Sequence, residues 1–403
     1  MPRVAITGQG TINPLGKSVS ETYEAFKNGI CGISQLEMQD IERLSVKIGG
    51  QIKGFNPEEH FTRQEISLYD RYTQLALLAA KEALNDSGII FEGELSEKSG
   101  VVLGTAGGGL TTQDNSYRSV YEEKKNRVHP FVVPRLMNNA AASNVSMVHN
   151  LQGPTFSVAT ACASSNHAIG IAYQMIRSGI SQCMVAGGSE CMICFGGMKV
   201  WESLRVMSPE KCRPFSKNRK GMVLGEGAAL FVLEDLDHAK NRGANIIAEI
   251  VGFSMTSDAK DIVAPSLEGP ARAIRGALDD AQVQPEEIQY INSHGTGTTI
   301  NDRVETAVIR SVFDDYADKL MISSTKSMHG HLIGSTGAVE LLACTMALQE
   351  GVIAPTISYE EFDPECDLDV VPNTARDAKV SATVSNAFAF GGLNAVLVLK
   401  SID

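Results

Sequence analysis

The sequence predicts a layered α/β protein, and three observations support this fold class. Short apolar runs that end in glycine alternate with amphipathic segments along the chain, as buried strands and helices do. The order of strand, glycine turn and helix occurs in both halves, which indicates a duplicated unit. A chain of 403 residues is also too long for one small core. We therefore expect an N-terminal half over residues 1–245 and a C-terminal half over residues 246–403.

The N-terminal half contains strand and helix patterns in turn. Residues 10–16 and 31–62 are expected to be irregular, and the polar stretch 111–134 to be a surface excursion. The glycine-rich residues 105–109 lack the Lys-Ser/Thr of a phosphate loop, so we interpret them as a turn that another segment approaches closely. Strands are expected at 4–8, 100–104, 155–159, 182–188 and 225–233, and helices at 20–28, 70–87, 138–149 and 163–179.

The C-terminal half repeats the alternation. Several of its strands run directly into polar segments that are rich in glycine, serine and threonine. Strands are expected at 246–252, 288–292, 321–324 and 382–385, and helices at 270–281, 302–312 and 338–350.

Composition excludes several classes of protein. The net charge of −12 argues against a nucleic-acid binder, and no apolar run is long enough to cross a bilayer. The first residues enter an apolar strand without the apolar core of a signal peptide. The eight cysteines are scattered and show no zinc-finger spacing, so we expect a reduced, cytoplasmic protein without a bound metal.

Cys162 lies where a short β-prone run meets a helical segment. A cysteine at this position is near a helix N-terminus, where the helix dipole and free backbone N–H groups favour the thiolate. A thiolate is a nucleophile. The alternative is a buried structural thiol, because free cysteine is among the most buried residue types.

Polar groups gather after three strands of the C-terminal half. His294 follows the first of these strands, Lys326 and His331 follow the second, and Phe390 with two glycines follows the last. Functional groups collect at strand ends in open α/β sheets, and the glycines allow backbone N–H groups to face a ligand. A thiol, two imidazoles and an ammonium are together suited to acyl transfer.

Two other uses of these groups remain open from the residues alone. A metal site could use His329 and His331 with Asp302, although their spacing matches metal ligands poorly. A cysteine protease would use a cysteine, a histidine and an orienting Asn or Asp, but it would leave the second histidine and the lysine without a role.

Four motifs give a more specific indication. They are residues 160–164 around Cys162, residues 292–298 around His294, residues 324–331 from Ser324 to His331, and residues 386–392 around Phe390. In sequence and order they resemble the β-ketoacyl-[acyl carrier protein] synthases of the elongating, type II class. The resemblance runs from Val4 to Leu399. It implies a thiolase-like, five-layer αβαβα fold of two similar halves, usually dimeric.

The resemblance also implies the reaction and the residue roles. Cys162 would accept an acyl chain from the phosphopantetheine arm of acyl carrier protein, and malonyl-carrier protein would then lose CO2 and condense with that chain. No other cofactor is implied. Backbone N–H groups of Cys162 and Phe390 would form the oxyanion hole, and Phe390 would also be the gate. The resemblance further assigns decarboxylation to His294 and His331 and support of the site to Lys326, with Glu340 as its partner. Asp302 and Glu305 would be supporting buried acids, and Phe388 would line the site.

Some positions depart from the usual family pattern. Thr299 to Asn301 replace a usual Pro-Gly, His329 replaces a threonine or alanine, and Leu393 replaces a threonine. The expected carrier-protein docking surface is weakly basic, with Arg63, Arg71 and Arg127. These features resemble the nodulation-type and type II polyketide ketosynthases more than housekeeping fatty-acid enzymes. Acyl-chain length would depend on residues 105–140 and 195–207.

Related classes fit less well. A degradative thiolase carries a second cysteine in its C-terminal glycine motif, which is absent here, and an initiating synthase pairs Cys with His and Asn. A chain-length-factor subunit lacks the nucleophile, whereas Cys162 is present. The chain is therefore expected to be a homodimer, or the catalytic member of a heterodimer with a homologous chain-length factor.

Overall fold

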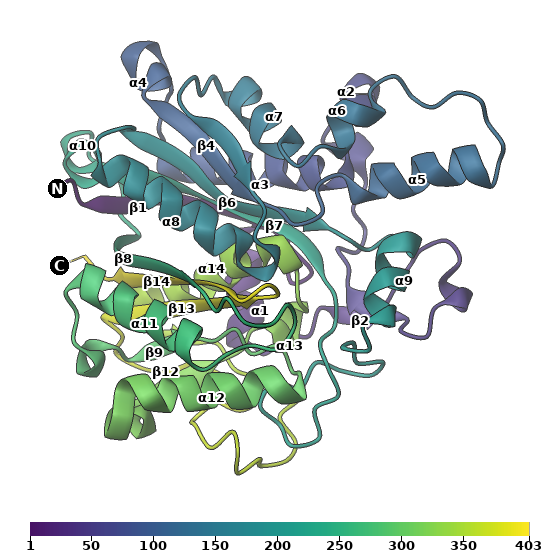
Figure 1. The fold of residues 1–403 in the computed structure, drawn as a ribbon. Helices are drawn as coiled ribbons and strands as arrows, with labels where there is room; N and C mark the ends of the chain where they lie inside the picture. Colours follow the sequence, from purple (N-terminus) through teal and green to yellow (C-terminus); the bar gives the residue numbers. More distant parts are fainter. Residues whose placement is uncertain (403) are drawn as a thin grey trace.

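The computed structural model describes residues 1–402, and its main feature is one mixed sheet in two parts. The two parts join where β1 pairs with β8 over only three residues, Val4–Ile6 against Ala248–Ile250. Figure 1 shows one part above the other. The upper part has the order β5(Thr155–Val158), β4(Ser99–Gly104), β6(Cys183–Cys191), β7(Glu226–Asp235), β1(Val4–Ile12), and the lower part β8(Ala248–Ser257), β14(Leu393–Lys400), β13(Ala382–Ala389), β9(Tyr290–Asn292), β10(Met321–Ser323).

Helices cover both parts, so that five layers result. Helices α8(Ser164–Arg177) and α14(Thr336–Glu350) lie between the two parts and share one core with both. Helices α3(Arg71–Ser87) and α7(Ala140–His149) cover the outer face of the upper part. Helices α11(Glu268–Ala281) and α12(Thr299–Phe313) cover the outer face of the lower part. The predicted five-layer α/β fold is confirmed.

The helix sequences match their layers. In α14, buried residues run without a break from Thr336 to Ala347, because the helix is enclosed by both parts of the sheet. Helix α3 is amphipathic. The Asp70 side chain accepts a hydrogen bond from the first turn of α3, and Gly88 ends the helix in the left-handed conformation at φ 62°. Both ends of this helix agree with the sequence-based prediction.

The strand directions bring the polar segments to one edge. Strands β9, β10 and β13 are parallel, so the segments that carry His294, Lys326 and Phe390 leave the sheet on the same side. Strand β5 is parallel to β4 and ends just before Cys162. The lower part of the sheet therefore gathers three separate segments, and Cys162 joins them from the upper part.

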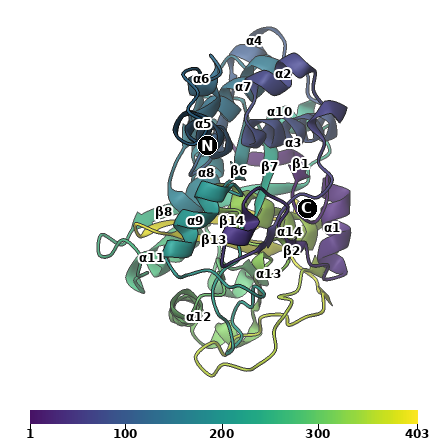
Figure 2. The same cartoon turned by 90° about the vertical axis from the view of Figure 1, so that its right-hand side faces the viewer.

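Several elements differ from the prediction. Residues 10–12, expected to be a loop, continue β1 because they pair with β7. The polar stretch 111–134, expected to be a surface excursion, is largely exposed, and it holds α5(Leu110–Tyr121) and most of a short helix, α6(Val132–Leu136), neither of which was predicted. Residues 31–62 contain the hairpin of β2(Ile33–Gln35) and β3(Ile48–Gly50). Helix α9(Phe195–Ser203) was not predicted; Figure 2 shows it at the level where the two parts meet. Within residues 1–402, no helix combines the length and apolarity that a membrane crossing requires.

Candidate active site

Three buried side chains, Cys162, His294 and His331, meet in one cavity. Cys162 lies in the short turn Ala161–Ala163 between β5 and α8, and the two histidines follow β9 and β10. One donor atom from each residue lies within 4.8 Å of the others. The cavity has a volume of about 360 Å³, and Phe388 and Phe390 also line it. The sequence placed these side chains at strand ends, and the fold brings them together.

The Cys162 thiol is more strongly shielded than the sequence suggested. Ala161 takes the left-handed conformation at φ 47°, which turns the chain sharply before the helix. Burial raises the pKa of the Cys162 thiol to about 11, against the lowering effects of Lys326 and of the backbone N–H groups of Phe390 and Cys162. Burial therefore opposes the thiolate that the helix N-terminus and the free backbone N–H groups are expected to favour.

The two histidines are neutral and face each other edge to face. Their ring centroids lie 5.6 Å apart with planes at 82°. Burial, followed by the nearby Lys326 ammonium, holds the pKa of each imidazole well below its usual value. The backbone N–H of Ile333 donates to Nδ1 of His331 over 3.2 Å, so Nε2 carries the ring proton. That Nε2 is buried and has no hydrogen-bond partner within residues 1–402.

Lys326 lies behind the histidines, at the start of α13(Lys326–His329), and is closed to solvent. Its ammonium forms an ion pair with Glu340 of α14, which is also fully buried, and donates to the backbone carbonyl of His294. A buried charge requires such a partner. The pairing of Lys326 with Glu340 agrees with the sequence-based expectation.

Two buried acids fix the His294 segment. Glu305 accepts hydrogen bonds from the backbone N–H groups of His294 and Gly295, at 2.8 and 2.7 Å. Asp302 accepts from the N–H groups of Phe215 and Gly297. Both acids lie on α12, directly after the segment that they hold. They orient the loop and do not line the cavity.

Three aromatic residues line the cavity, Phe388, Phe390 and Trp201, and the sequence did not single out the third. Phe388 packs at 6.1 Å from the His294 ring. Phe390 stacks on Trp201 of α9, with ring centroids 6.1 Å apart and planes at 23°. Trp201 also lines the cavity and is the single tryptophan of the chain. Its position fell within the stretch 195–207 expected to set acyl length, but only the fold places it against Phe390.

The expected docking arginines differ in their surroundings. Arg63, at the start of α2(Arg63–Leu68), and Arg127 are exposed. Arg71 forms two hydrogen bonds to buried Glu226, at 2.8 and 2.6 Å. Arg71 therefore stabilises the interior and does not contribute a free cation to a docking surface, which corrects the expectation for this residue.

The metal set considered from the sequence does not form. Both ring nitrogens of His329 have protein partners, Gly330 and Thr325, and Asp302 is bound to backbone N–H groups. Cys162, His294 and His331 are close enough to bind zinc, whose ligands are of these types. The buried Lys326 ammonium, which lowers the pKa of both histidines, opposes a divalent cation at the same place.

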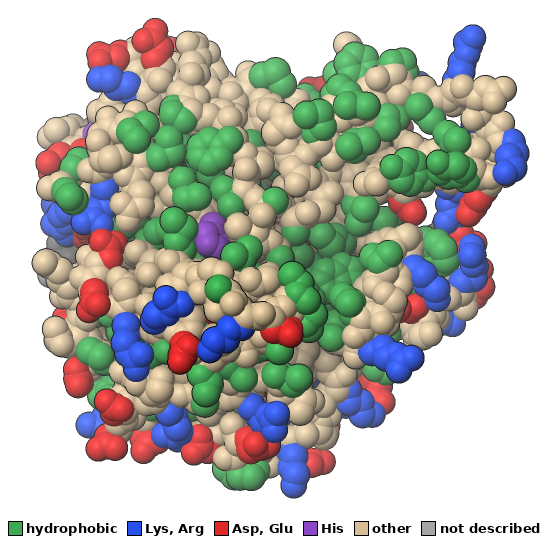
Figure 3. Space-filling view, in the orientation of Figure 1, with side chains coloured by type: hydrophobic (Ala, Val, Ile, Leu, Met, Phe, Trp, Pro, Cys, Tyr) green, Lys and Arg blue, Asp and Glu red, His purple; other side chains and the backbone are tan. Residues whose placement is uncertain are grey.

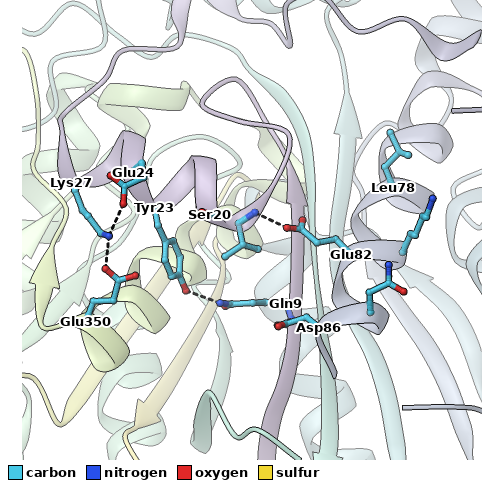
Figure 4. Close-up of a pocket in the computed structure, with 12 residues that line it drawn as sticks. Gln9, Ser20, Tyr23, Glu24, Lys27, Leu78, Glu82, Asp86 and Glu350 are labelled. Carbon is cyan, nitrogen blue, oxygen red and sulfur yellow. Dashed lines mark hydrogen bonds and ion pairs between the residues drawn. The ribbon is translucent and has the colours of Figure 1, made fainter. Parts of the chain in front are cut away.

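A larger cavity, of about 590 Å³, lies apart from these groups. Figure 4 shows that its lining residues contact one another: Lys27 lies between Glu24 and Glu350, and Gln9 donates to Tyr23. It contains no cysteine or histidine. This cavity is a cleft beside α1(Val19–Lys27) and α3 with no group suited to nucleophilic chemistry.

Comparisons with known proteins agree with this geometry. Residues 1–239 match the model of the beta-ketoacyl synthase N-terminal domain, and residues 247–360 match that of the C-terminal domain. Nodulation protein E of Rhizobium leguminosarum bv. trifolii is 44% identical over 400 residues, covering 99% of each chain. The 3-oxoacyl-[acyl-carrier-protein] synthase 2 of Staphylococcus aureus (strain N315) is 40% identical over 408 residues, covering 100% of this chain and 99% of the relative.

A solved structure matches over the same extent. The ishigamide ketosynthase/chain length factor superposes with a TM-score of 0.95 at 33% identity, covering 100% of both chains. The fold is thus the thiolase-like fold of the ketosynthases. The chain belongs to the β-ketoacyl synthase family. The resemblance drawn from the four motifs is confirmed.

Proposed function

We propose that this chain is a β-ketoacyl-[acyl carrier protein] synthase that condenses malonyl-carrier protein with an acyl chain held on Cys162. The observation that carries this proposal is the cavity in which a buried thiol lies within 4.8 Å of two buried imidazoles. The full-length similarity to a 3-oxoacyl-[acyl-carrier-protein] synthase supports the same reaction. The 3-oxoacyl-carrier protein is the product.

The first step is acyl transfer. The Cys162 sulfur attacks the thioester carbonyl of the acyl-carrier protein, the bond to the phosphopantetheine sulfur breaks, and the thiol proton ends on that leaving sulfur. Backbone N–H groups of Cys162 and Phe390 stabilise the oxyanion of the tetrahedral intermediate. Their effect on the thiol pKa supports this role, since both act at the reacting sulfur.

The second step is decarboxylation. The malonyl group loses CO2, and the electron pair of the broken C–C bond forms an enolate on the thioester. Two neutral N–H donors, His294 and His331, stabilise the enolate oxygen without transferring the proton that would quench it. The protonated and unpartnered Nε2 of His331 is suited to this role. Burial, followed by the Lys326 ammonium, keeps both rings neutral.

The third step forms the new bond. The enolate carbon attacks the thioester carbonyl on Cys162, and the Cys162 sulfur leaves and takes up a proton. Phe390 separates the acyl side from the malonyl side, and its stacking on Trp201 supports a gate at this point. Phe388 keeps the His294 ring in place.

Acyl carrier protein is the proposed partner in both half-reactions, with its phosphopantetheine arm carrying the substrates. Exposed Arg63 and Arg127 would attract the acidic carrier. The similarity to a 3-oxoacyl-[acyl-carrier-protein] synthase supports this partner.

A second, homologous chain is proposed against β5. Strand β5 lies at the edge of the sheet with Phe156 exposed. Figure 3 shows apolar side chains gathered at the upper right, over α5 to α7. The exposed apolar residues of this region are Tyr117, Val120, Tyr121, Val128, Phe131, Val133, Met137, Met147 and Val148. A free edge beside such a patch favours association. The partner is a second copy or a chain-length-factor subunit, and the match to a ketosynthase/chain length factor supports the latter.

We also propose a biosynthetic pathway and a cellular location for this protein. The similarity to nodulation protein E supports a specialised acyl chain or polyketide as the product. All eight cysteines are free, which fits the reduced cytoplasm. We also propose that residues 1–245 and 246–403 are the two halves of the fold, the first supplying Cys162 and the second supplying His294, His331 and Lys326.

The test is a reconstituted condensation. The protein is incubated with malonyl-loaded carrier protein and a panel of acyl-carrier proteins, alone and with a homologous subunit that lacks the cysteine. Mass spectrometry is expected to detect 3-oxoacyl-carrier protein extended by two carbons. The proposal is contradicted if no acyl-carrier protein gives this product under either condition.

A further inference from the structure

Glu190 is a buried carboxylate in the site region without a role so far. It lies near the end of β6, is fully buried, and forms no ion pair within residues 1–402. Its Oε1 accepts from the Thr105 hydroxyl at 3.1 Å and the Gly107 N–H at 3.2 Å. Its Oε2 accepts from the N–H groups of Ala106 at 2.7 Å and Gly334 at 3.1 Å.

The carboxylate joins two segments that are far apart in the sequence. Residues 105–107 follow β4, and Gly334 belongs to the turn after His331. A Cβ atom on Gly334 would lie 2.5 Å from both the Ala106 nitrogen and the Glu190 Oε2. Gly334 permits this close approach because it has no Cβ atom, and Glu190 holds the two segments at that separation.

The segment that Glu190 holds at Gly334 also contacts the imidazole of His331. Ile333 precedes Gly334 and adopts φ 46°, a left-handed conformation that is unfavourable for a β-branched side chain. Such a conformation persists only when its surroundings hold it. The N–H of Ile333 donates to Nδ1 of His331, which places the ring proton on Nε2.

We propose that Glu190 is a positioning residue that fixes the tautomer and ring orientation of His331 through the Ile333–Gly334 backbone. All four groups around the carboxylate are donors, so an acceptor is required at both oxygens. A neutral amide at this position accepts through one oxygen only, so its NH2 group faces either the N–H of Gly107 or the N–H groups of Ala106 and Gly334, and the connection between the two segments is weakened. The inference rests on the proposed role of His331 in decarboxylation.

The first test separates the half-reactions in Glu190→Gln. Malonyl-carrier protein decarboxylation is expected to lose on the order of 100-fold in kcat with little change in KM, because a small misplacement of a reacting group has that effect. Acyl transfer to Cys162 is expected not to fall, since Cys162 lies on another segment and the Glu190 charge, which contributes to the raised pKa of the thiol, is removed. Equal losses in both half-reactions would overturn the proposal.

A matched control is Glu234→Gln. Glu234 is also fully buried, lies on the neighbouring strand β7, and binds Arg242 away from the cavity. This change is expected to lower stability and to leave the decarboxylation kcat of the folded protein unchanged. A loss in this control equal to that of Glu190→Gln would show a general effect of buried charge and would overturn the proposal.

The second test is independent of activity. Nitrogen NMR of ¹⁵N-histidine-labelled protein reports the tautomer of each ring, and His331→Asn assigns the His331 signals. Wild type is expected to show the Nε2–H form at His331, and Glu190→Gln a mixture of tautomers. An unchanged Nε2–H form in folded Glu190→Gln would overturn the proposal. If wild type does not decarboxylate malonyl-carrier protein, the proposed function fails, and the NMR result still decides the role of Glu190.

Milder variants cover the case in which Glu190→Gln does not fold. Thr105→Val removes one of the four hydrogen bonds, and Gly334→Ala forces the two segments apart. A graded fall in decarboxylation, smaller for Thr105→Val than for Gly334→Ala, is expected. Wild-type rates and tautomers in both variants would contradict the proposed role.

Discussion

The Lys326 ammonium donates a hydrogen bond to the backbone carbonyl of His294 and pairs with the Glu340 carboxylate where none of the three side chains is open to solvent. Lys326 thereby acts on the histidines in two ways. It holds the His294 segment by direct contact, and its charge lowers the pKa of both imidazoles. Both effects serve decarboxylation, which needs neutral N–H donors in a fixed place.

A pH profile tests the electrostatic effect. Both histidine pKa values lie well below 6.5 in the native protein, so wild-type decarboxylation is expected to stay level as pH falls through that value. Burial is the main cause of these low pKa values and the Lys326 charge is the next, so replacing Lys326 by Met should move the acid limb, the pH range in which the rate falls as pH decreases, to higher pH.

Glu340→Gln is combined with Lys326→Met in this experiment. The second change avoids an unpaired buried carboxylate, which costs roughly 3–5 kcal/mol. CO2 release from malonyl-carrier protein is measured as a function of pH, and the pH at which the rate falls on the acid side is compared. An acid limb at the same pH in wild type and double variant would contradict the electrostatic role of Lys326.

Because the two histidines are assigned to decarboxylation alone, their loss should affect that half-reaction and not acyl transfer. His294→Ala and His331→Ala should each lower malonyl decarboxylation by about 100-fold or more, since a single oxyanion donor has an effect of this size. Both variants should still accept an acyl chain on Cys162. His238→Ala, on α10(Leu236–Asn241), is the control and should retain both activities. Full CO2 release by either site variant would remove its residue from the mechanism.

Trp201 provides a signal for the gate. Because the single tryptophan stacks on Phe390 and lines the cavity, occupation of the acyl side should change its environment. We expect the emission spectrum to shift when an acyl-carrier protein loads Cys162, and not in Cys162→Ala mixed with the same donor. Identical shifts in the two proteins would show that Trp201 senses carrier binding and not the acyl chain.

Carrier-protein docking should depend on salt. Arg63→Glu and Arg127→Glu are each expected to raise the KM for carrier protein at low ionic strength, by roughly tenfold, and the difference from wild type should shrink as salt screens the charges. Arg275→Glu, on the α11 face, is the charge-matched control. A KM that is the same in all four proteins at low salt would exclude this docking surface.

The sequence predicted the parts of the site that depend on strand order. His294, Lys326 and Phe390 follow the parallel strands β9, β10 and β13, which bring them to one edge, and Cys162 follows β5 in the other part of the sheet. The layers followed from the same alternation of apolar and polar segments. Helix α5 was missed because its surface is mostly polar, so its apolar periodicity is weak.

Effects that depend on tertiary packing could not be predicted. The high thiol pKa of Cys162 arises from burial that no local pattern reveals. Arg71 appeared to be a free cation until the fold placed Glu226 beside it. Trp201 and Glu190 act through contacts with residues more than 80 positions away, such as Phe390 and Gly334, and neither lies in a motif.

The central claim is that Cys162 holds the acyl chain while the histidines make the carbanion, and one measurement tests it most directly. Wild type and Cys162→Gln are each incubated with an acyl-carrier protein, digested and analysed by mass spectrometry, and CO2 release from malonyl-carrier protein is recorded alongside. We expect the acyl mass on the peptide that contains Cys162 in wild type, no acylated peptide in Cys162→Gln, and decarboxylation in both. An acyl group on another residue of wild type, or on the Cys162→Gln protein, would contradict the account.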